Sequence, residues 1–503
     1  MTTSLSSPEN SAISSQNVEL PARQERFTTY RIKHTLASRF AFLLVCVSII
    51  LSALAYGTVH YWALAIFFLG AVAILALWVV DSWNLGTVRV NRNVLQWPLL
   101  GMLLLGVIQL LPLRNPGAPS GLSVPFVKSL SLDPYATRLV LVQTLALSIY
   151  FAAALVFVDT PKRLRLLVRT IIIFGFFLAI FGLTQSFTSP NKLYWIREMS
   201  QSTPFGPFIN RHHFAGYMEL ALALPLGLLF SGSIEKEKRL IYLFVVSLMA
   251  VALIMTNSRG GIISMGAEIL FVIVLGVGRR RRGEPSSSRL THIRTAAGKG
   301  VLALGLFVVL FVGVVSLGGE DVLNRMVGTV NSEDPTTGRA HFWDATLDII
   351  KNHPVIGTGL GAFGVVYTGY DSRNGLYRLE QAHNDYLQVL SDGGVVGALL
   401  GLFFIVNLFR MGFARRDSRD EFRRGVATGA MAGCFAVLVH SFFDFTLHTP
   451  SNALLFLIVA ALATMNGRVE EVQNRRRRHS RGRHRRGSSL ARSEEASAVV
   501  SSA

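Results

Sequence analysis

Long apolar runs constrain the fold of this 503-residue chain more than any other feature of its sequence. Runs of about 18 or more apolar residues recur along most of its length, and each can cross a bilayer core about 30 Å thick as a helix. The chain is 51% hydrophobic and 16% charged, with a mean hydropathy of +0.43, outside the usual range for soluble domains. We therefore predict an all-α polytopic membrane protein.

The apolar pattern predicts about twelve transmembrane helices. They fall at 38–57, 61–80, 95–113, 139–158, 167–186, 213–231, 240–257, 260–278, 299–317, 393–410, 425–442 and 452–466. The predicted organisation is a disordered cytoplasmic N-terminus (1–36), spans one to nine (37–317), a large periplasmic loop with short helices (318–392), spans ten to twelve (393–466) and a disordered basic cytoplasmic tail (467–503). No cleavable signal peptide is visible, so the first span is expected to act as an uncleaved anchor.

Basic residues fix the predicted orientation. With the N-terminus in the cytoplasm, arginine runs such as 279–282 and 475–478 fall on the cytoplasmic side, as the positive-inside rule requires. Both termini are then cytoplasmic. The tail is interpreted as a topology lock and a contact for anionic lipid, with no nucleic-acid partner. Cys46 and Cys434 fall inside spans and indicate neither a disulfide framework nor a metal cluster.

The largest predicted outer connection, 318–392, contains helical spacing. In "TTGRAHFWDATLDIIKNHP", residues 336–354, the apolar side chains Phe342, Ala345, Leu347 and Ile350 recur at helical intervals. Short helices are therefore expected to lie over the membrane mouth.

Three arginines stand out on the predicted outer side, where the positive-inside rule disfavours cations. Arg211 lies in "INRHHFAGY", Arg259 in the short hairpin "TNSRGG", and Arg339 in "TGRAHFW". Snorkelling to lipid phosphates is the plain explanation of one such arginine. Several arginines converging at membrane level would suit a bidentate grip on a lipid-linked phosphate or pyrophosphate.

His383 lies on the same side, just before span ten. Histidine accepts a proton near neutral pH, so beside a bound phosphate it could deprotonate a sugar hydroxyl or water. A hydrogen bond within the loop is the alternative. The remaining histidines lack a ligand-like spacing with a nearby acidic partner, so we expect metal-free chemistry and no cofactor.

The stretch His383-Asn384, nine residues, Gly394, two residues, Gly397 resembles the signature of bacterial O-antigen ligases and the related O-antigen polymerases. The "SRGG" and "GRAxxW" segments strengthen this resemblance, which covers roughly residues 40–466. It implies a GT-C-like helical fold with a large periplasmic loop before a late span. It also implies metal-independent glycosyl transfer from a glycan on undecaprenyl pyrophosphate.

By the same resemblance, His383 would be the general base, and Arg211, Arg259 and Arg339 would hold the pyrophosphate. Asn384 and Asp385 would orient His383 or bind sugar, with His212 as a further supporting residue. Attack from the opposite face would invert the anomeric carbon. The site would face the periplasm from the bacterial inner membrane.

The acceptor stays open at this point. Ligation to the lipid A core is favoured over polymerisation, which joins two undecaprenyl-linked glycans, and over transfer to a protein. A secondary transporter is the alternative of another class, and Glu219 and Glu268 would then mark a buried polar site. Against it, the two halves show no internal repeat, and the patterned residues lie at the outer face.

Overall fold

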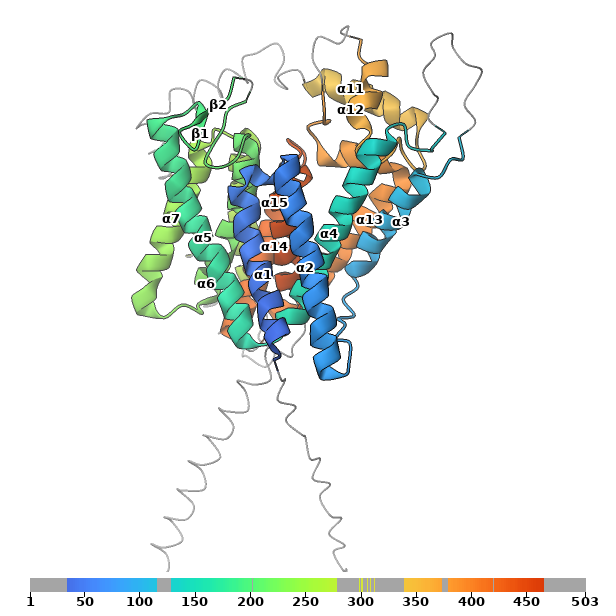
Figure 1. Cartoon of the computed structure of the whole chain (residues 1–503). Helices are drawn as coiled ribbons and strands as arrows, with labels where there is room; N and C mark the ends of the chain where they lie inside the picture. Colours follow the sequence, from blue (N-terminus) through green and yellow to red (C-terminus); the bar gives the residue numbers. More distant parts are fainter. Residues whose placement is uncertain are drawn as a thin grey trace, which may run out of the picture. The chain divides into compact units, whose positions relative to one another are not determined.

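The computed structural model describes residues 34–114, 128–200, 202–277, 339–372, 379–418 and 420–465, with isolated residues between 298 and 312. Of the two compact units, 1–34 and 35–503, the second holds every helix and strand described below. Most of these helices and both strands are labelled in Figure 1. The helices are α1 (Leu36–Leu54), α2 (Tyr61–Leu85), α3 (Gln96–Gln109), α4 (Pro134–Phe157), α5 (Pro161–Thr188), α6 (Arg211–Ser231), α7 (Arg239–Met255), α8 (Arg259–Val277), α11 (Arg339–Asn352), α12 (Phe363–Val366), α13 (Asp385–Arg416), α14 (Glu421–His440) and α15 (Pro450–Thr464). Four 3-10 turns, η1 (Tyr56–Thr58), η2 (Lys236–Lys238), η3 (Tyr367–Gly369) and η4 (Thr446–His448), and one short hairpin, β1 (Lys192–Leu193) with β2 (Arg197–Glu198), complete the described elements.

The predicted all-α membrane architecture is confirmed. Within the described residues, eight helical segments are long and apolar enough to cross a membrane: α1, α2, α4, α5, α6, α7 with its preceding turn, α13 and α14. Helices α3 and α15 are shorter apolar helices, and α8 covers the predicted eighth span. The predicted ninth span, 299–317, lies outside the described ranges apart from isolated residues.

Helix α13 starts earlier than predicted. It begins at Asp385 rather than at the glycines of the predicted span 393–410, because Asn384 caps it by accepting from the Tyr386 and Leu387 amides at 3.0 and 3.2 Å. Gly394 lies inside the helix with a φ of 61°, and a Cβ there would lie 2.6 Å from the Gly357 amide nitrogen. Because this glycine of the signature has no Cβ, the turn at 354–361 can pack directly against the helix backbone.

The tightest helix pair in the core is α6 with α14. A Cβ on Gly227 of α6 would lie 2.5 Å from the Cα of Gly429 of α14, so glycine at this crossing lets the two backbones meet. Helix α15 is buried along its whole length, as expected for a helix that is apolar all round. This packing brings the end of α14 beside the start of α6.

Side-chain contacts at the helix ends show the alternating course of the chain. Arg163, at the start of α5, donates to the Ser38 hydroxyl of α1 at 3.0 Å. It also forms an ion pair with Asp159 at 3.4 Å. Arg89 contacts the same Asp159 and Asp81 of α2, and so links the two carboxylates. These contacts define one end of the bundle. The opposite end, which holds His383, is called the site end below.

The helix predicted within 336–354 is present as α11. Its buried face holds Ala345, Thr346 and Ile349, whereas Leu347 is 43% exposed. The prediction of a helix is thus confirmed and the placement of Leu347 on its apolar face is wrong. Trp343 of α11 donates from Nε1 to the carbonyl of Ala382 at 3.2 Å, which ties the helix to the backbone just before His383.

Candidate active site

A buried carboxylate, Asp444, lies at the centre of the site end. Its side chain is 1% exposed. His383 Nδ1 lies 3.3 Å from Oδ1, and His212 Nδ1 and Arg339 lie 3.7 and 3.8 Å from Oδ2. Three of the residues predicted from the sequence are therefore brought together on one carboxylate that the sequence reasoning missed.

The turn after α14 places Asp444. Its amide donates to the carbonyl of His440 at 3.1 Å, and its Oδ1 also accepts from the amide of Phe445 at 2.9 Å. Burial alone would raise the pKa of Asp444, but the hydrogen bond from His383 and the nearby His212 and His213 lower it well below its usual value. Asp444 is thus a fixed anion beside an imidazole.

His383 is held between this carboxylate and two aromatic rings. The Phe445 and Phe342 ring centroids lie 4.8 and 6.4 Å from that of the imidazole, and the side chain stays 28% exposed. Its backbone φ is 51°, a left-handed value that is costly for a residue other than glycine. Because Nδ1 faces Asp444, Nε2 is the ring nitrogen turned away from the carboxylate. The arrangement suits a base whose orientation is fixed by an acid.

Asn384 and Asp385 have structural partners. Besides capping α13, Asn384 donates from Nδ2 to the Phe442 carbonyl at 3.3 Å. Asp385 accepts from the Ser441 hydroxyl at 2.8 Å and from His448 Nδ1 at 2.9 Å. These contacts fasten the start of α13 to the 441–449 connection, and so hold His383 near Asp444.

The predicted arginines stand at helix starts that meet at this end. Arg211, Arg259 and Arg339 are the first residues of α6, α8 and α11, and each is half-buried. The Ser258 hydroxyl, next to Arg259, lies 2.8 Å from Nδ1 of His212, next to Arg211. Since α13 also begins here, the positive ends of four helix dipoles share the region.

Electrostatics at the arginines favour an anion. Burial lowers the pKa of Arg339, Asp444 opposes this shift, and Arg259 adds to it. Two guanidinium groups that repel one another in a partly buried site are stabilised by an anionic ligand. The region around Asp444 therefore places an imidazole beside guanidinium groups, a kind of side chain that can bind phosphate oxygens.

Sequence reasoning also missed the contact between His440 and Glu219, which lies behind the arginines. His440 Nδ1 lies 2.8 Å from Glu219 Oε1, with both side chains wholly buried. A Cβ on Gly260 would lie 2.7 Å from the His440 ring, so this pair supports the start of α8 beside Arg259. Their place in the sequence could have identified these residues as candidates for the site. His440, Asp444 and His448 all lie in or next to the predicted outer connection between spans eleven and twelve.

The His448–Asp385 pair is expected to make stability fall as the pH rises. Burial alone would lower the pKa of His448, but the hydrogen bond and charge of Asp385 raise it above its usual value. The stabilisation of the folded protein by this pair is thus complete below the pKa of His448 in the unfolded chain, about 6.5. It is lost as the pH rises through the raised pKa of the folded protein. Between pH 6 and pH 9, the melting temperature in detergent should fall by about 2 °C more in the native protein than in His448→Gln. Equal falls would contradict this assignment.

Comparison with known proteins finds a family and a relative that part of the chain resembles. Residues 244–402 match the family model described as O-antigen ligase, a segment that contains Arg259, Arg339 and His383 and ends before Asp444. The exopolysaccharide production protein ExoQ of Rhizobium meliloti (strain 1021) is 25% identical over 224 residues, which cover 42% of this chain and 46% of ExoQ. The chain thus matches less than half the length of this relative. The resemblance to the O-antigen ligase and polymerase superfamily is confirmed.

Proposed function

We propose that this membrane protein transfers a glycan from undecaprenyl pyrophosphate to a sugar hydroxyl, without a metal, and inverts the anomeric carbon. The observation that carries the proposal is the convergence of His383, His212 and Arg339 on the buried Asp444 carboxylate. The family match supports glycan transfer at the level of the superfamily. The sidedness, with the site at the periplasmic face of the inner membrane and both termini in the cytoplasm, is part of the proposal and rests on the distribution of basic residues.

The donor pyrophosphate would lie among Arg211, Arg259 and Arg339. Guanidinium groups bind phosphate oxygens through paired N–H donors, and helix starts add backbone N–H groups and a positive dipole. As the bond from the sugar to the pyrophosphate breaks, negative charge grows on the leaving oxygen. Fixed positive charge aimed at that oxygen lowers the barrier.

His383 would take the acceptor proton. The acceptor oxygen forms a bond to the anomeric carbon while its proton passes to Nε2, and the electron pair of the broken bond leaves on the lipid pyrophosphate. Asp444 holds the Nδ1 proton and stabilises the imidazolium that results. Attack opposite the leaving group inverts the configuration. Phe342 and Phe445 offer ring faces on which a sugar ring can pack.

Two acceptors fit this chemistry. The description of the matched family favours the lipid A core, as in an O-antigen ligase. The name of the relative ExoQ, an exopolysaccharide production protein, favours a second undecaprenyl-linked glycan, as in a polymerase. Both share the donor step and the residues given above, so the acceptor is a separate question.

The test is glycan transfer by purified full-length protein in the presence of EDTA. With an undecaprenyl-pyrophosphate glycan and a choice of acceptors, we expect product with an inverted linkage and no loss of rate on adding EDTA. Arg259→Ala should lower transfer about 100-fold, because a fixed positive charge at the leaving group is removed.

Arg410→Ala is the matched control, because Arg410 is an exposed arginine near the far end of α13. It should transfer at the native rate. A clear loss with EDTA would sink the metal-independent chemistry. Equal effects of Arg259→Ala and Arg410→Ala would sink the pyrophosphate site.

A further inference from the structure

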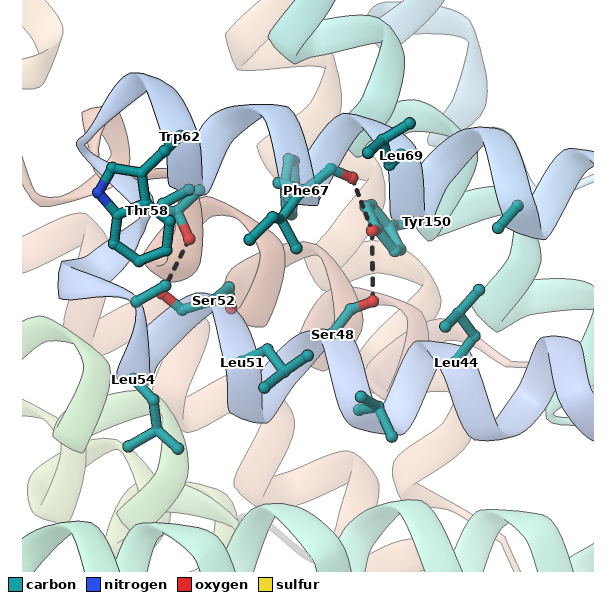
Figure 2. A pocket seen from close by; sticks show the side chains of 16 residues that line it. Leu44, Ser48, Leu51, Ser52, Leu54, Thr58, Trp62, Phe67, Leu69 and Tyr150 are labelled. Atoms are coloured by element: carbon teal, nitrogen blue, oxygen red, sulfur yellow. Dashed lines mark hydrogen bonds between the residues drawn. The ribbon is translucent and has the colours of Figure 1, made fainter.

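An apolar groove of about 500 Å³ runs between α1 and α2, away from Asp444. Figure 2 shows leucines of α1 facing Trp62, Phe67 and Leu69 of α2, with Tyr150 of α4 between the two helices. The Tyr150 hydroxyl donates to the Phe67 carbonyl at 2.9 Å and accepts from the Ser48 hydroxyl at 3.2 Å. These polar groups bind one another, so the groove offers mainly hydrocarbon to a ligand.

The groove lies between two helices that can each cross a membrane. Leu51, Ile66 and Leu69 line it and are 48%, 51% and 68% exposed. In a bilayer, an open apolar groove of this kind takes an apolar chain from the side. A space bounded by one pair of helices fits one chain better than a bundle of chains.

The mouth of the groove at the site end carries its own cation. Trp62 and Thr58 line the groove, and the ring of Trp62 packs edge-on against Tyr56 at 6.1 Å. The exposed Arg197 lies over the Tyr56 ring at 5.9 Å, with its NH1 group 2.9 Å from His60 Nε2. Burial and Arg197 both lower the pKa of His60, so a neutral imidazole accepts from the guanidinium. The remaining donors of Arg197 suit a phosphate group at the end of an apolar chain.

Backbone strain marks the same mouth. Tyr56, Thr58, Tyr194 and Trp195 have φ values of 57°, 65°, 52° and 62°. Tyr194 and Trp195 form the turn between β1 and β2, where glycine or asparagine would be unstrained. In the described residues, the other two non-glycine residues with positive φ are Asn257 and His383, at the candidate active site. Such strain gathers at functional sites, so its second location points to a second binding site.

The mouth lies next to the His383 side of the active site. A Cβ on Gly57 of η1 would lie 3.0 Å from the Thr449 side chain, and the preceding residue, His448, binds Asp385. The arginines assigned to the donor start α6, α8 and α11, whereas Arg197 lies on β2. Two anionic groups would thus have separate cationic partners, which lie on different elements.

We infer that the groove between α1 and α2 seats the chain of a second lipid substrate, a single-chain lipid phosphate that carries the acceptor glycan. Its phosphate would lie at Arg197 and its glycan would extend toward His383. This inference rests on the proposed function and selects one of its two acceptors. A lipid A core brings several acyl chains, whereas an undecaprenyl-linked glycan brings one, so the groove favours polymerisation of carrier-linked glycans.

The test counts the lipids bound to the full-length protein by native mass spectrometry during titration with undecaprenyl phosphate. The native protein should bind two. Ala73→Trp fills the groove from an exposed lining position and should bind one. Ala76→Trp, at an exposed position on the same helix that does not line the groove, should bind two. Arg197→Ala should weaken one site about tenfold, the loss expected for a charged hydrogen bond, and Lys192→Ala on the paired strand should not.

Other outcomes separate this inference from the proposed function. Arg259→Ala should weaken the site that Ala73→Trp leaves intact. If it weakens neither site while Ala73→Trp still removes one lipid, the donor proposal fails and the groove stands. Equal stoichiometry for Ala73→Trp and Ala76→Trp would overturn the groove. Equal displacement of its lipid by phosphatidylglycerol or undecaprenol would also overturn it, because the groove would then be an ordinary seat for membrane lipid.

Discussion

Replacing His383 with alanine is expected to lower glycan transfer about 100- to 10,000-fold, the usual contribution of a positioned general base. His383 is the imidazole held by the buried Asp444 at 3.3 Å, and its Nε2 is turned away from that carboxylate. Without it, the proton of that hydroxyl has no acceptor when the bond to the anomeric carbon forms. The measurement is the initial rate of transfer by purified protein at saturating donor.

Two controls keep this result from being a folding effect. His353→Ala removes a histidine that follows α11, outside the cluster on Asp444, and should keep the native rate. His383→Ala should also melt close to the native temperature and regain part of its activity when imidazole is added. Transfer at the native rate by His383→Ala would disprove the role as general base.

The sequence could predict the parts of the site that depend on local pattern. Apolar runs located the eight described helices that are long and apolar enough to cross a membrane, because a helix in lipid needs a continuous apolar segment. The cost of an arginine at the membrane face drew attention to Arg211, Arg259 and Arg339, and these proved to be the first residues of α6, α8 and α11.

Contacts between distant segments could not be predicted in this way. Asp444 meets His383 because the glycine crossing of α6 and α14 and the cap of α13 place both ends together, and no spacing in the sequence records that meeting. The same holds for the His440–Glu219 pair. Glu219, considered in the sequence as a sign of transport, has a histidine partner behind the start of α8. The helix start at Asp385 was missed because a polar first turn hides a helix from a hydropathy pattern.

Asp444→Asn is expected to lower the rate of transfer without weakening donor binding. Variants of the arginines assigned to the donor should instead weaken donor binding. Asparagine can present either a donor or an acceptor to His383 Nδ1, so the imidazole is no longer held in the tautomer that leaves Nε2 as a base. We expect kcat to fall about 100- to 10,000-fold, because the carboxylate that stabilises the imidazolium is lost. The change also removes a negative charge 3.8 Å from Arg339 and 3.7 Å from His212. The apparent Kd for undecaprenyl pyrophosphate should therefore stay constant or decrease, whereas Arg259→Ala should increase it.

Asp371→Asn is the matched control, because it breaks another Asp–His contact, the 2.8 Å pair with His341, outside the cluster on Asp444. Its kcat should stay within a few-fold of the native value. A purely structural role for Asp444 predicts a different pattern, since collapse of the site end would weaken donor binding together with kcat and lower the melting temperature. Native kcat in Asp444→Asn would show that the carboxylate has no part in transfer. Loss of donor binding in that variant would assign Asp444 to the architecture of the site and leave His383 without a fixed acidic partner.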